Sequence, residues 1–434
     1  MKNAIINMLR KARLRALTPA MHDLGQQEQM IRLTAEAGLI TRAMVKRSQK
    51  KTITVLLVCH EPSFWNMFES LYRTVKEDSG FSVNVVAMPY NHSSLPKGQF
   101  KDAGMLDFLQ AKGIEAIQGY SPEQNKWVNP AVLQPDYVFF QNPYELFPRM
   151  WSAEYVSLIA RVCYIPYATC ILKGHIHAVV HPPGFLKFTH LIFTENTDTR
   201  MMLKEKFNGE PWLDLDHIVG VGNPKLEYLA NAPFPQASVW RRGLDPKIKR
   251  ILWTPRWNTG EGNCHFFDYK GYFEAFCAEH AEVDFALRPH PLCFQNFLKT
   301  GEMTKEELSE MELHYAQTPN MVIDKTGGYE NSFLTSDILI SDVSSLLMEY
   351  IVIGKPIIYT HRVDHFNDLW RHLSSGFYWV RNKSELANTL KMLLAGDDPL
   401  QQTRMKLKEQ LLGMQKGGSS KLIMEALRFD FERY

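Results

Sequence analysis

Short apolar runs of strand length alternate with helical segments along most of this chain, in two separate series. The first series predicts strands at 53–58, 83–87, 114–117, 136–140, 162–165, 190–194 and 218–221. The second predicts them at 250–253, 283–287, 321–323, 338–340, 357–359 and 377–380. The segments between them have helical composition, and 64–76 carries apolar residues with a period near 3.6. This alternation is typical of parallel, doubly wound sheets.

Proline and glycine signals over 232–249 interrupt the alternation and predict a domain boundary. The predicted parts are a basic helical arm (1–51), an N-terminal Rossmann-like domain (52–235), a C-terminal Rossmann-like domain (245–418) and a last helix (419–434). The predicted fold class is α/β of the GT-B type, with two doubly wound domains facing a cleft. Such sheets bind ligands at the carboxyl ends of their strands. The fold leaves a glycosyltransferase, an epimerase and a binding protein open.

Composition is that of a soluble globular protein long enough for two cores, with 434 residues, 45% hydrophobic and 22% charged. A net charge of +2 predicts no nucleic-acid partner. The first 51 residues hold 11 Lys or Arg against 3 Asp or Glu. This arm could contact an acidic membrane surface. A solvated helical arm is the preferred interpretation.

The cysteines and the hydrophobic runs predict a cytoplasmic protein. Contact of the basic arm with the inner face of the membrane stays an open alternative. The six cysteines lack paired metal spacing, which indicates buried thiols in a reducing compartment. No apolar run is long enough to span a membrane, and no signal peptide is recognisable. His175 and His177 have no acidic or cysteine partner at ligand spacing, so no metal site is predicted. The nucleotide signatures GxGxxG and GxxxxGK[ST] are absent.

A hydroxyl-rich turn, Ser341-Asp342-Val343-Ser344-Ser345, lies between a predicted strand and a predicted helix. Free N–H groups and serine hydroxyls at such a position favour phosphate. The alternative is that Asp342 or Ser344 only caps the helix. Glu349 follows Ser345 by four residues, on the same helical face. Its carboxylate is a candidate acceptor of hydrogen bonds from ribose hydroxyls. The alternative is that Glu349 is a solvated charge on the helix surface.

Two loops that follow strands of the second domain carry further candidates. In Arg288-Pro289-His290-Pro291, the prolines hold His290 on a stiff loop. His290 is a candidate general base or a candidate hydrogen-bond donor to a phosphate. Arg288 and Arg256 are candidate phosphate ligands. The alternatives are a surface histidine and exposed loop charges.

Two strand ends of the first domain supply candidates for the acceptor side. His60 and Glu61 follow the strand at 53–58, and Tyr167 follows the strand at 162–165. Because the carboxyl ends of parallel strands share one edge of the sheet, these side chains are expected to face the same ligand.

The motifs of the second half resemble those of the CDP-glycerol glycerophosphotransferase family, the teichoic-acid primases and polymerases and their capsule-making relatives. The resemblance covers about 215–360. The matching motifs are, in order, 221–227, Trp253-Thr254-Pro255, Arg288-Pro289-His290-Pro291, 336–345 and Gly354-Lys355-Pro356. The family patterns there are "G-x-P-K-x-D", "W-A-P", "H-P", "S-D-x-L-I-T-D-Y-S-S" and "K-P-I-I-F-Y". The first domain matches more loosely, at 61–65 and 137–144.

The resemblance implies a GT-B enzyme that binds CDP-glycerol or a related CDP-alditol, with the pyrophosphate near Ser344 and Ser345. His290 would lie at the reaction centre, and an acceptor hydroxyl on a glycan, lipid-linked or polymer acceptor would displace CMP. No cofactor is required, although Mg²⁺ could assist. Family members also carry a "W-H-G" histidine in the first domain, where this chain has Tyr167-Ala168-Thr169.

Two alternatives remain open at this stage. One is a GT-B glycosyltransferase that uses a nucleotide sugar. The other is a non-catalytic component of a polysaccharide assembly complex, which the missing first-domain histidine would fit.

Overall fold

The chain folds into two compact α/β units. The computed structural model describes residues 26–91, 95–96, 98–168, 180–210, 212–235, 238–326, 328–361, 366–413 and 418–433. The first unit contains the described residues up to Tyr228 and those from Gly418 onward, and the second contains the described residues from Leu229 to Gly413. The N-terminal 25 residues of the predicted arm, and His175 and His177, lie outside the described residues.

The first unit is built on a seven-stranded sheet in the order β3-β2-β1-β6-β7-β8-β9, in which every neighbouring pair is parallel. The strands are β1 (Ile53–Cys59), β2 (Phe81–Ala87), β3 (Ile117–Gln118), β6 (Tyr137–Phe140), β7 (Arg161–Tyr164), β8 (Leu191–Thr194) and β9 (Ile218–Gly220). The order reverses between β1 and β6. A short antiparallel hairpin, β4 (Tyr120–Ser121) and β5 (Lys126–Trp127), follows β3.

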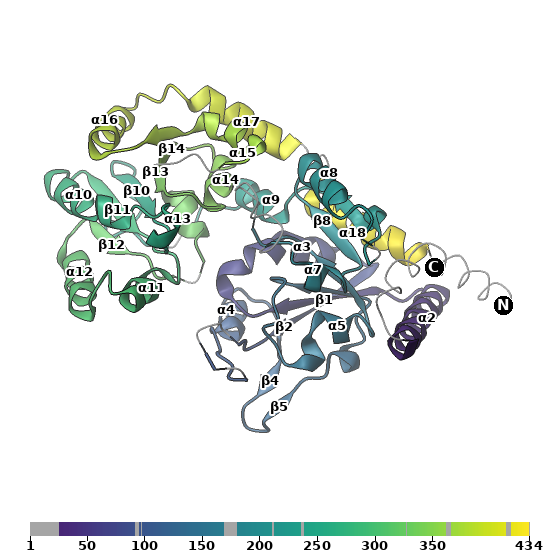
Figure 1. The fold of residues 1–434 in the computed structure, drawn as a ribbon. Helices are drawn as coiled ribbons and strands as arrows, with labels where there is room; N and C mark the ends of the chain where they lie inside the picture. Colours follow the sequence, from purple (N-terminus) through teal and green to yellow (C-terminus); the bar gives the residue numbers. More distant parts are fainter. Residues whose placement is uncertain are drawn as a thin grey trace. The chain divides into compact units, whose positions relative to one another are not determined.

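Helices cover both faces of this sheet, so its central strands β1, β6, β7 and β8 are buried on both sides. One face packs against α3 (Asn66–Glu77), α4 (Met105–Ala111) and the last helix, α18 (Ser419–Glu432) (Figure 1). The other packs against α5 (Ala153–Val156), α7 (Pro183–Leu186) and α8 (Thr197–Lys206). The unit also contains the short 3-10 helices η2 (Pro62–Phe64), η3 (Pro130–Leu133), η4 (Arg149–Trp151) and η5 (Leu215–His217), and it includes the start of α9 (Pro224–Asn231).

Helix α2 (Gln26–Ser48), the described part of the predicted arm, packs against the first unit. Lys46 forms an ion pair with buried Asp136 at 2.5 Å, and Arg42 donates to two backbone carbonyl groups. Leu39 and Ile40 are buried. The interpretation of this segment as a solvated arm is therefore wrong for 26–48, because its charged residues bind the domain.

Helix α18 also belongs to the first unit, although the sequence separates it from that unit by the whole second domain. Its Asp430 accepts hydrogen bonds from Tyr137 at 2.7 Å and from Arg161 at 3.1 Å, and it contacts His190 at 2.9 Å. These partners lie at or just before the amino ends of β6, β7 and β8. The last segment, which the sequence analysis set apart, is thus an integral part of the first unit.

The second unit contains a six-stranded sheet in the order β12-β11-β10-β13-β14-β15, again with parallel neighbours throughout. The strands are β10 (Lys249–Thr254), β11 (Val283–Leu287), β12 (Met321–Ile323), β13 (Ile338–Ser341), β14 (Ile357–Thr360) and β15 (Tyr378–Val380). Here the order reverses between β10 and β13. Both units are therefore doubly wound parallel sheets, as predicted.

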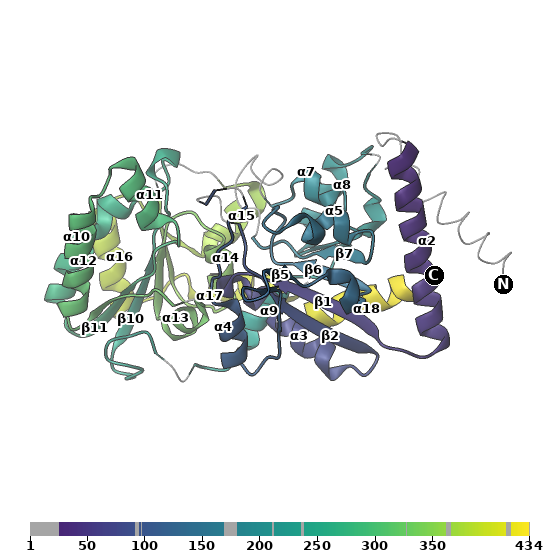
Figure 2. The ribbon, with the colours of Figure 1, turned by 90° about the horizontal axis from the view of Figure 1, so that it is seen from below.

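The helices of the second unit enclose its sheet. They are α10 (Phe266–Glu279), α11 (Cys293–Thr300), α12 (Lys305–Gln317), α13 (Glu330–Thr335), α14 (Leu346–Ile351), α15 (Asp368–Leu373), α16 (Lys383–Leu394) and α17 (Gln401–Gly413), with η6 (Thr259–Glu261) and η7 (Ser374–Gly376). Figure 2 shows α10, α12 and α16 together on one side of the sheet, where they share one hydrophobic core with it.

Two predictions of helices fail. The segment 152–162 was expected to be helical, but α5 ends at Val156 and β7 already begins at Arg161. Helix α11 was not predicted; it begins two residues after Pro291, directly behind the loop that carries His290. Among the described residues, no helix is long and apolar enough to cross a membrane.

Candidate functional site

The strand order of the second unit reverses between β10 and β13. Doubly wound sheets bind ligands in a crevice at such a reversal point, and we refer to this position as the crevice between β10 and β13. The loop after β10 carries Arg256, and the turn after β13 is the hydroxyl-rich segment 341–345. The topology therefore brings together two of the motifs that the sequence analysis selected separately.

Asp342 connects the segments on both sides of this reversal point through hydrogen bonds. Its Oδ2 accepts the backbone N–H of Arg256 at 2.9 Å and that of His265 at 3.1 Å, and its Oδ1 accepts the Thr360 hydroxyl at 2.5 Å. The residue is buried, and burial raises the pKa of the carboxyl group. Because both oxygens are occupied, Asp342 holds loops from β10 and β14 against β13. We therefore assign it a bracing role rather than direct contact with phosphate.

The two serines after this brace are half-buried at the start of α14. The Ser344 hydroxyl accepts the Leu346 N–H at 3.3 Å, which is the capping role that the alternative interpretation gave it. The Ser345 side chain makes no capping hydrogen bond. Ser345 therefore has a hydroxyl available to a ligand, while Ser344 would have to share its oxygen.

Arg256 reaches across the crevice from β10 to β13. Its Nη1 donates to the carbonyl oxygen of Val343 at 3.2 Å, and its Nε donates to Glu261 at 2.6 Å. Glu261 is exposed, and an exposed ion pair contributes little free energy, so an incoming phosphate can replace it. Arg256 remains a candidate phosphate ligand.

His290 lies beside this loop, on the surface of the second unit. Its ring stacks on Trp257, with centroids 5.9 Å apart, and its Nδ1 accepts the Leu292 N–H at 3.2 Å. Crowding by protein atoms and the nearby Arg256 charge lower the pKa of His290 to about 4, so the ring is neutral near pH 7. Since Nδ1 is the acceptor, the single proton lies on Nε2. In this tautomer His290 offers a donor, not a base.

Arg288 is bound within the protein. It forms an ion pair with buried Asp324 at 2.7 Å and donates to the Thr326 hydroxyl at 3.1 Å and the Thr326 carbonyl at 2.9 Å. The Arg288 guanidinium in turn holds the pKa of Asp324 below its usual value, against the effect of burial. Arg288 joins the ends of β11 and β12, so a role in shaping the site is better supported than direct phosphate binding.

Glu349 is buried in α14, so the interpretation as a solvated helix charge is wrong. Its carboxylate accepts the hydroxyl of Tyr329, and the Arg288 guanidinium lies 5.9 Å from the centre of the Tyr329 ring. This contact chain connects α14 with the loop after β11. Contact between Glu349 and a ribose stays a prediction.

The first unit repeats the same device at its own reversal point, between β1 and β6. The Gln141 side-chain oxygen, directly after β6, accepts the backbone N–H of His60 at 2.7 Å and that of Glu61 at 3.0 Å. Gln141 is completely buried. It therefore corresponds by position and by hydrogen bonding to Asp342, with a neutral amide in place of a carboxylate.

The three acceptor-side candidates lie near one another at this edge. His60 is buried against Tyr90 and Phe64, and burial lowers its pKa to about 3. Glu61 is partly exposed and accepts the Tyr90 hydroxyl at 2.8 Å. The Tyr167 ring packs on Phe64, with centroids 5.8 Å apart. Only Glu61 among them presents a carboxylate to solvent.

A family model for CDP-glycerol:poly(glycerophosphate) glycerophosphotransferases matches residues 187–428, more than half of the chain. The chain belongs to this family. The match includes the whole second unit and the crevice between β10 and β13. The family resemblance, the assignment as a transferase, and the transfer of glycerol phosphate from CDP-glycerol to a polymer acceptor are thereby confirmed. No curated protein sequence matches the chain.

Solved structures resemble the whole chain at low sequence identity. A UDP-N-acetylglucosamine 2-epimerase superposes with a TM-score of 0.56 at 15% identity, covering 88% of this chain and 97% of its own. The wall teichoic acid polymerase TagF gives 0.55 at 13%, covering 94% and 99%. The S. aureus MnaA–UDP complex gives 0.53 at 12%, covering 88% and 98%. These similarities confirm the GT-B fold class.

The structure adds residues that sequence reasoning missed. Asp324, Tyr329, His265 and Thr360 each bind a residue that the sequence analysis selected. Asp324 directly follows β12, and this position could have indicated it as a candidate site residue. Nothing in the sequence pairs it with Arg288, which is 36 residues away. Within the described residues, no group of three or more metal-binding side chains is placed to hold an ion.

Proposed function

We propose that the crevice between β10 and β13 of this glycerophosphotransferase holds the pyrophosphate of CDP-glycerol, and that the edge of the first unit near Glu61 holds the acceptor. The observation that carries the donor assignment is the brace at Asp342. It fixes Arg256 and the serine turn on the two sides of the reversal point. A fixed cation and fixed hydroxyl groups suit a diphosphate, because they need no reorganisation when charge develops.

In the reaction, an acceptor hydroxyl oxygen attacks the phosphorus that bears the glycerol. A new phosphorus–oxygen bond forms, the bond to the bridging oxygen breaks, and CMP leaves with that oxygen. The hydroxyl proton must go to a base, and the negative charge on the leaving CMP must be stabilised. The residues of the chain can be assigned to these two tasks.

His290 is assigned to the second task. Its Nε2–H can donate to a phosphate oxygen, whereas its Nδ1 is already occupied by the Leu292 N–H. Arg256 and the Ser345 hydroxyl are assigned to the same charge.

Glu61 is assigned as the base on the acceptor side. It is the partly exposed carboxylate of that edge, and Gln141 and Tyr90 fix its position through the backbone and the side chain. His60 is buried, so it is better suited to position the loop than to exchange a proton. This assignment gives the chain a base without the "W-H-G" histidine of other family members.

The test compares His290→Gln with His290→Ala in a CMP-release assay with CDP-glycerol and a polymer acceptor. Glutamine retains an N–H donor but cannot act as a base at neutral pH. If His290 donates, the glutamine variant should keep clearly more activity than the alanine variant, which should lose about 10²–10³-fold, as for loss of one charge-stabilising donor.

Equal and near-complete loss in both variants would instead assign His290 as the base. In that case Glu61→Gln should retain most activity. If Glu61 is the base, Glu61→Gln should lower kcat by about 10²–10⁴-fold, with CDP-glycerol affinity unchanged.

Two finer assignments are also part of this proposal. Association with an acidic membrane surface is assigned to the N-terminal part of the basic segment, because Arg42 and Lys46 of α2 are already bound to the first unit. Magnesium, if it assists, is expected to bind chiefly through the phosphates of the donor. Vesicle sedimentation and activity in the presence of a chelator test these two points.

A further inference from the structure

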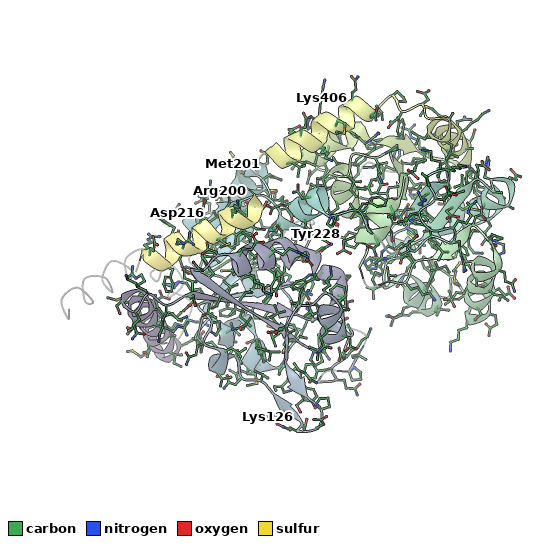
Figure 3. The ribbon with its side chains drawn as sticks, turned by 180° about the vertical axis from the view of Figure 1, so that it is seen from behind. Lys126, Arg200, Met201, Asp216, Tyr228 and Lys406 are labelled. Atoms are coloured by element: carbon green, nitrogen blue, oxygen red, sulfur yellow. The ribbon has the colours of Figure 1, made fainter. Side chains whose placement is uncertain are left out.

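A pocket of about 550 Å³ opens at the carboxyl ends of β2 and β3 in the first unit, outside the residues assigned above. This volume lies within the range of about 300–1,000 Å³ that is usual for small-molecule sites. Three aromatic side chains, Phe100, Tyr120 and Trp127, form part of its wall. The last two come from the β4–β5 hairpin, in which Lys126 begins β5 (Figure 3).

The three rings form one continuous cluster around Trp127. The centroids of Trp127 and Tyr120 are 4.6 Å apart, and those of Trp127 and Phe100 are 4.8 Å apart. Trp127 is half-buried, with one part packed against the core of the first unit and another part lining the pocket. A ring held in this way presents a fixed apolar surface without loss of side-chain entropy on binding.

The hairpin is fastened to the end of β2, so the aromatic wall is rigid. Gly119 donates its N–H to the Ala87 carbonyl at 2.8 Å and accepts the Val128 N–H at 2.9 Å. A Cβ at Gly119 would lie 2.9 Å from the backbone oxygen of Ala87, so the close approach of the two backbones favours glycine here. Met88 also lines the pocket.

The polar part of the lining consists of exposed groups suited to hydroxyls rather than to phosphate. Among the described residues it includes Asp102, Gln118 and Asn125, and no lysine or arginine. Lys101 and Lys126, though close in sequence, are not part of the lining. A carboxylate without a cationic partner in the lining disfavours an anionic ligand. It can accept hydrogen bonds from ligand hydroxyls.

The pocket is connected to the acceptor edge by direct contacts within the first unit. The Met88 N–H donates to the Cys59 carbonyl at 2.7 Å, just before His60. Two residues further on, Tyr90 donates to Glu61 at 2.8 Å, and its ring packs on His60 with centroids 4.8 Å apart. The segment 88–90 therefore joins the pocket wall at Met88 to the loop that carries Glu61.

We propose that this pocket binds a neutral pyranose ring of the acceptor. A pyranose has an apolar C–H face that matches the Trp127 cluster, and a rim of hydroxyls that matches Asp102 and Gln118. A glycerol phosphate unit has neither the flat apolar face nor a neutral charge. The inference rests on the proposed function, because it names the acceptor class for the same transfer: a polymer or lipid-linked acceptor that carries an uncharged sugar.

The experiment uses the full chain and three probes: methyl β-D-glucopyranoside, methyl N-acetyl-β-D-glucosaminide and glycerol 3-phosphate. Saturation-transfer NMR and titration are performed on the wild type, Trp127→Ala, Trp127→Phe, Asp102→Asn and the control Lys126→Ala. At least one glycoside should bind the wild type, with strongest saturation on its C–H face. Its Kd should rise at least about tenfold in Trp127→Ala and less in Trp127→Phe, which keeps an aromatic ring.

Lys126→Ala should leave glycoside binding unchanged, and glycerol 3-phosphate should not compete with the glycoside. The inference is overturned if neither glycoside binds, if the glycoside Kd is the same in Trp127→Ala as in the wild type, or if glycerol 3-phosphate displaces the glycoside. If Trp127→Ala does not fold, the inference is tested with Asp102→Asn, a substitution at an exposed residue, and with the competition assay. Asp102→Asn should then bind the glycoside more weakly than the wild type.

CDP-glycerol binding and CMP release, measured on the same proteins, separate this inference from the proposed function. Trp127→Ala should bind CDP-glycerol with wild-type affinity. If the wild type binds CDP-glycerol and releases CMP but the pocket binds no sugar, the pocket inference fails alone. If the pocket binds sugar but CDP-glycerol does not bind, the proposed function fails instead.

Discussion

Replacing Asp342 tests the brace on which the donor site depends. The carboxylate accepts two backbone N–H groups, from Arg256 and His265, and the Thr360 hydroxyl. Asparagine could keep its oxygen toward the two N–H groups and turn its amide toward Thr360. The Thr360 hydroxyl can then donate to the Ser341 carbonyl, 3.1 Å away. Only the charge is lost.

The expected cost of Asp342→Asn is therefore small, about 1–2 kcal/mol, because the charge-assisted bonds become neutral ones while a buried charge is removed. Asp342→Ala leaves both backbone N–H groups without a partner. At about 1–3 kcal/mol for each unsatisfied buried group, the expected cost is roughly 3–5 kcal/mol. CDP-glycerol affinity should follow the same order, because the turn and Arg256 lose their shared anchor.

The assay is urea unfolding followed by fluorescence, together with calorimetric titration of CDP-glycerol. Gln141→Ala is the matched control, since Gln141 accepts two backbone N–H groups in the same manner in the first unit. It should destabilise the first unit and leave CDP-glycerol affinity unchanged. The reasoning is refuted if Asp342→Ala costs no more than Asp342→Asn, or if Gln141→Ala weakens CDP-glycerol binding as much as Asp342→Ala does.

Three further predictions concern other parts of the chain. The double substitution Ser344→Ala with Ser345→Ala should weaken CDP-glycerol binding by about 1–3 kcal/mol, and unchanged calorimetric affinity would remove the phosphate role. His60 has a pKa near 3 when folded, below its value when unfolded, so stability should fall as the pH decreases from about 6.5 towards 3. His60→Phe should reduce that slope in urea titrations at several pH values, and an identical slope would contradict the assignment. Lys46→Ala should destabilise the first unit by about 1–3 kcal/mol, because buried Asp136 loses the nearer of its two cationic partners and keeps Arg42. An unchanged unfolding midpoint would show that Arg42 suffices.

Local signals in the sequence predicted the strands and the main helices. Strands such as β1 and β13 are apolar runs buried on both faces, and the apolar period near 3.6 over 64–76 indicated α3. The capping box of Thr304 and Glu307 at the start of α12 is a further local feature of this kind, which the structure shows. These features depend on neighbours within a few residues, so the residues alone indicate them. The order of motifs was also sufficient to indicate the family.

Contacts between distant segments could not be predicted in the same way. Asp342 and Glu349 were selected as ligands or surface charges, yet the fold buries both and gives them protein partners. The sequence does not say which side chains meet when strands of the sheet become neighbours. The strand order decides that, and it places Arg256 beside Asp342, 86 residues away.

The sequence by itself determined the alternating elements, the parallel class of the sheets and the family. Only the tertiary structure decided that α18 completes the first unit, where Asp430 binds Tyr137 from 293 residues away. It likewise decided that a short hairpin turns Tyr120 and Trp127 into the wall of a pocket. The physical reason is that local propensity and hydrophobic period act over single elements. Burial and partner choice are set only when sheet order and helix packing bring remote residues together.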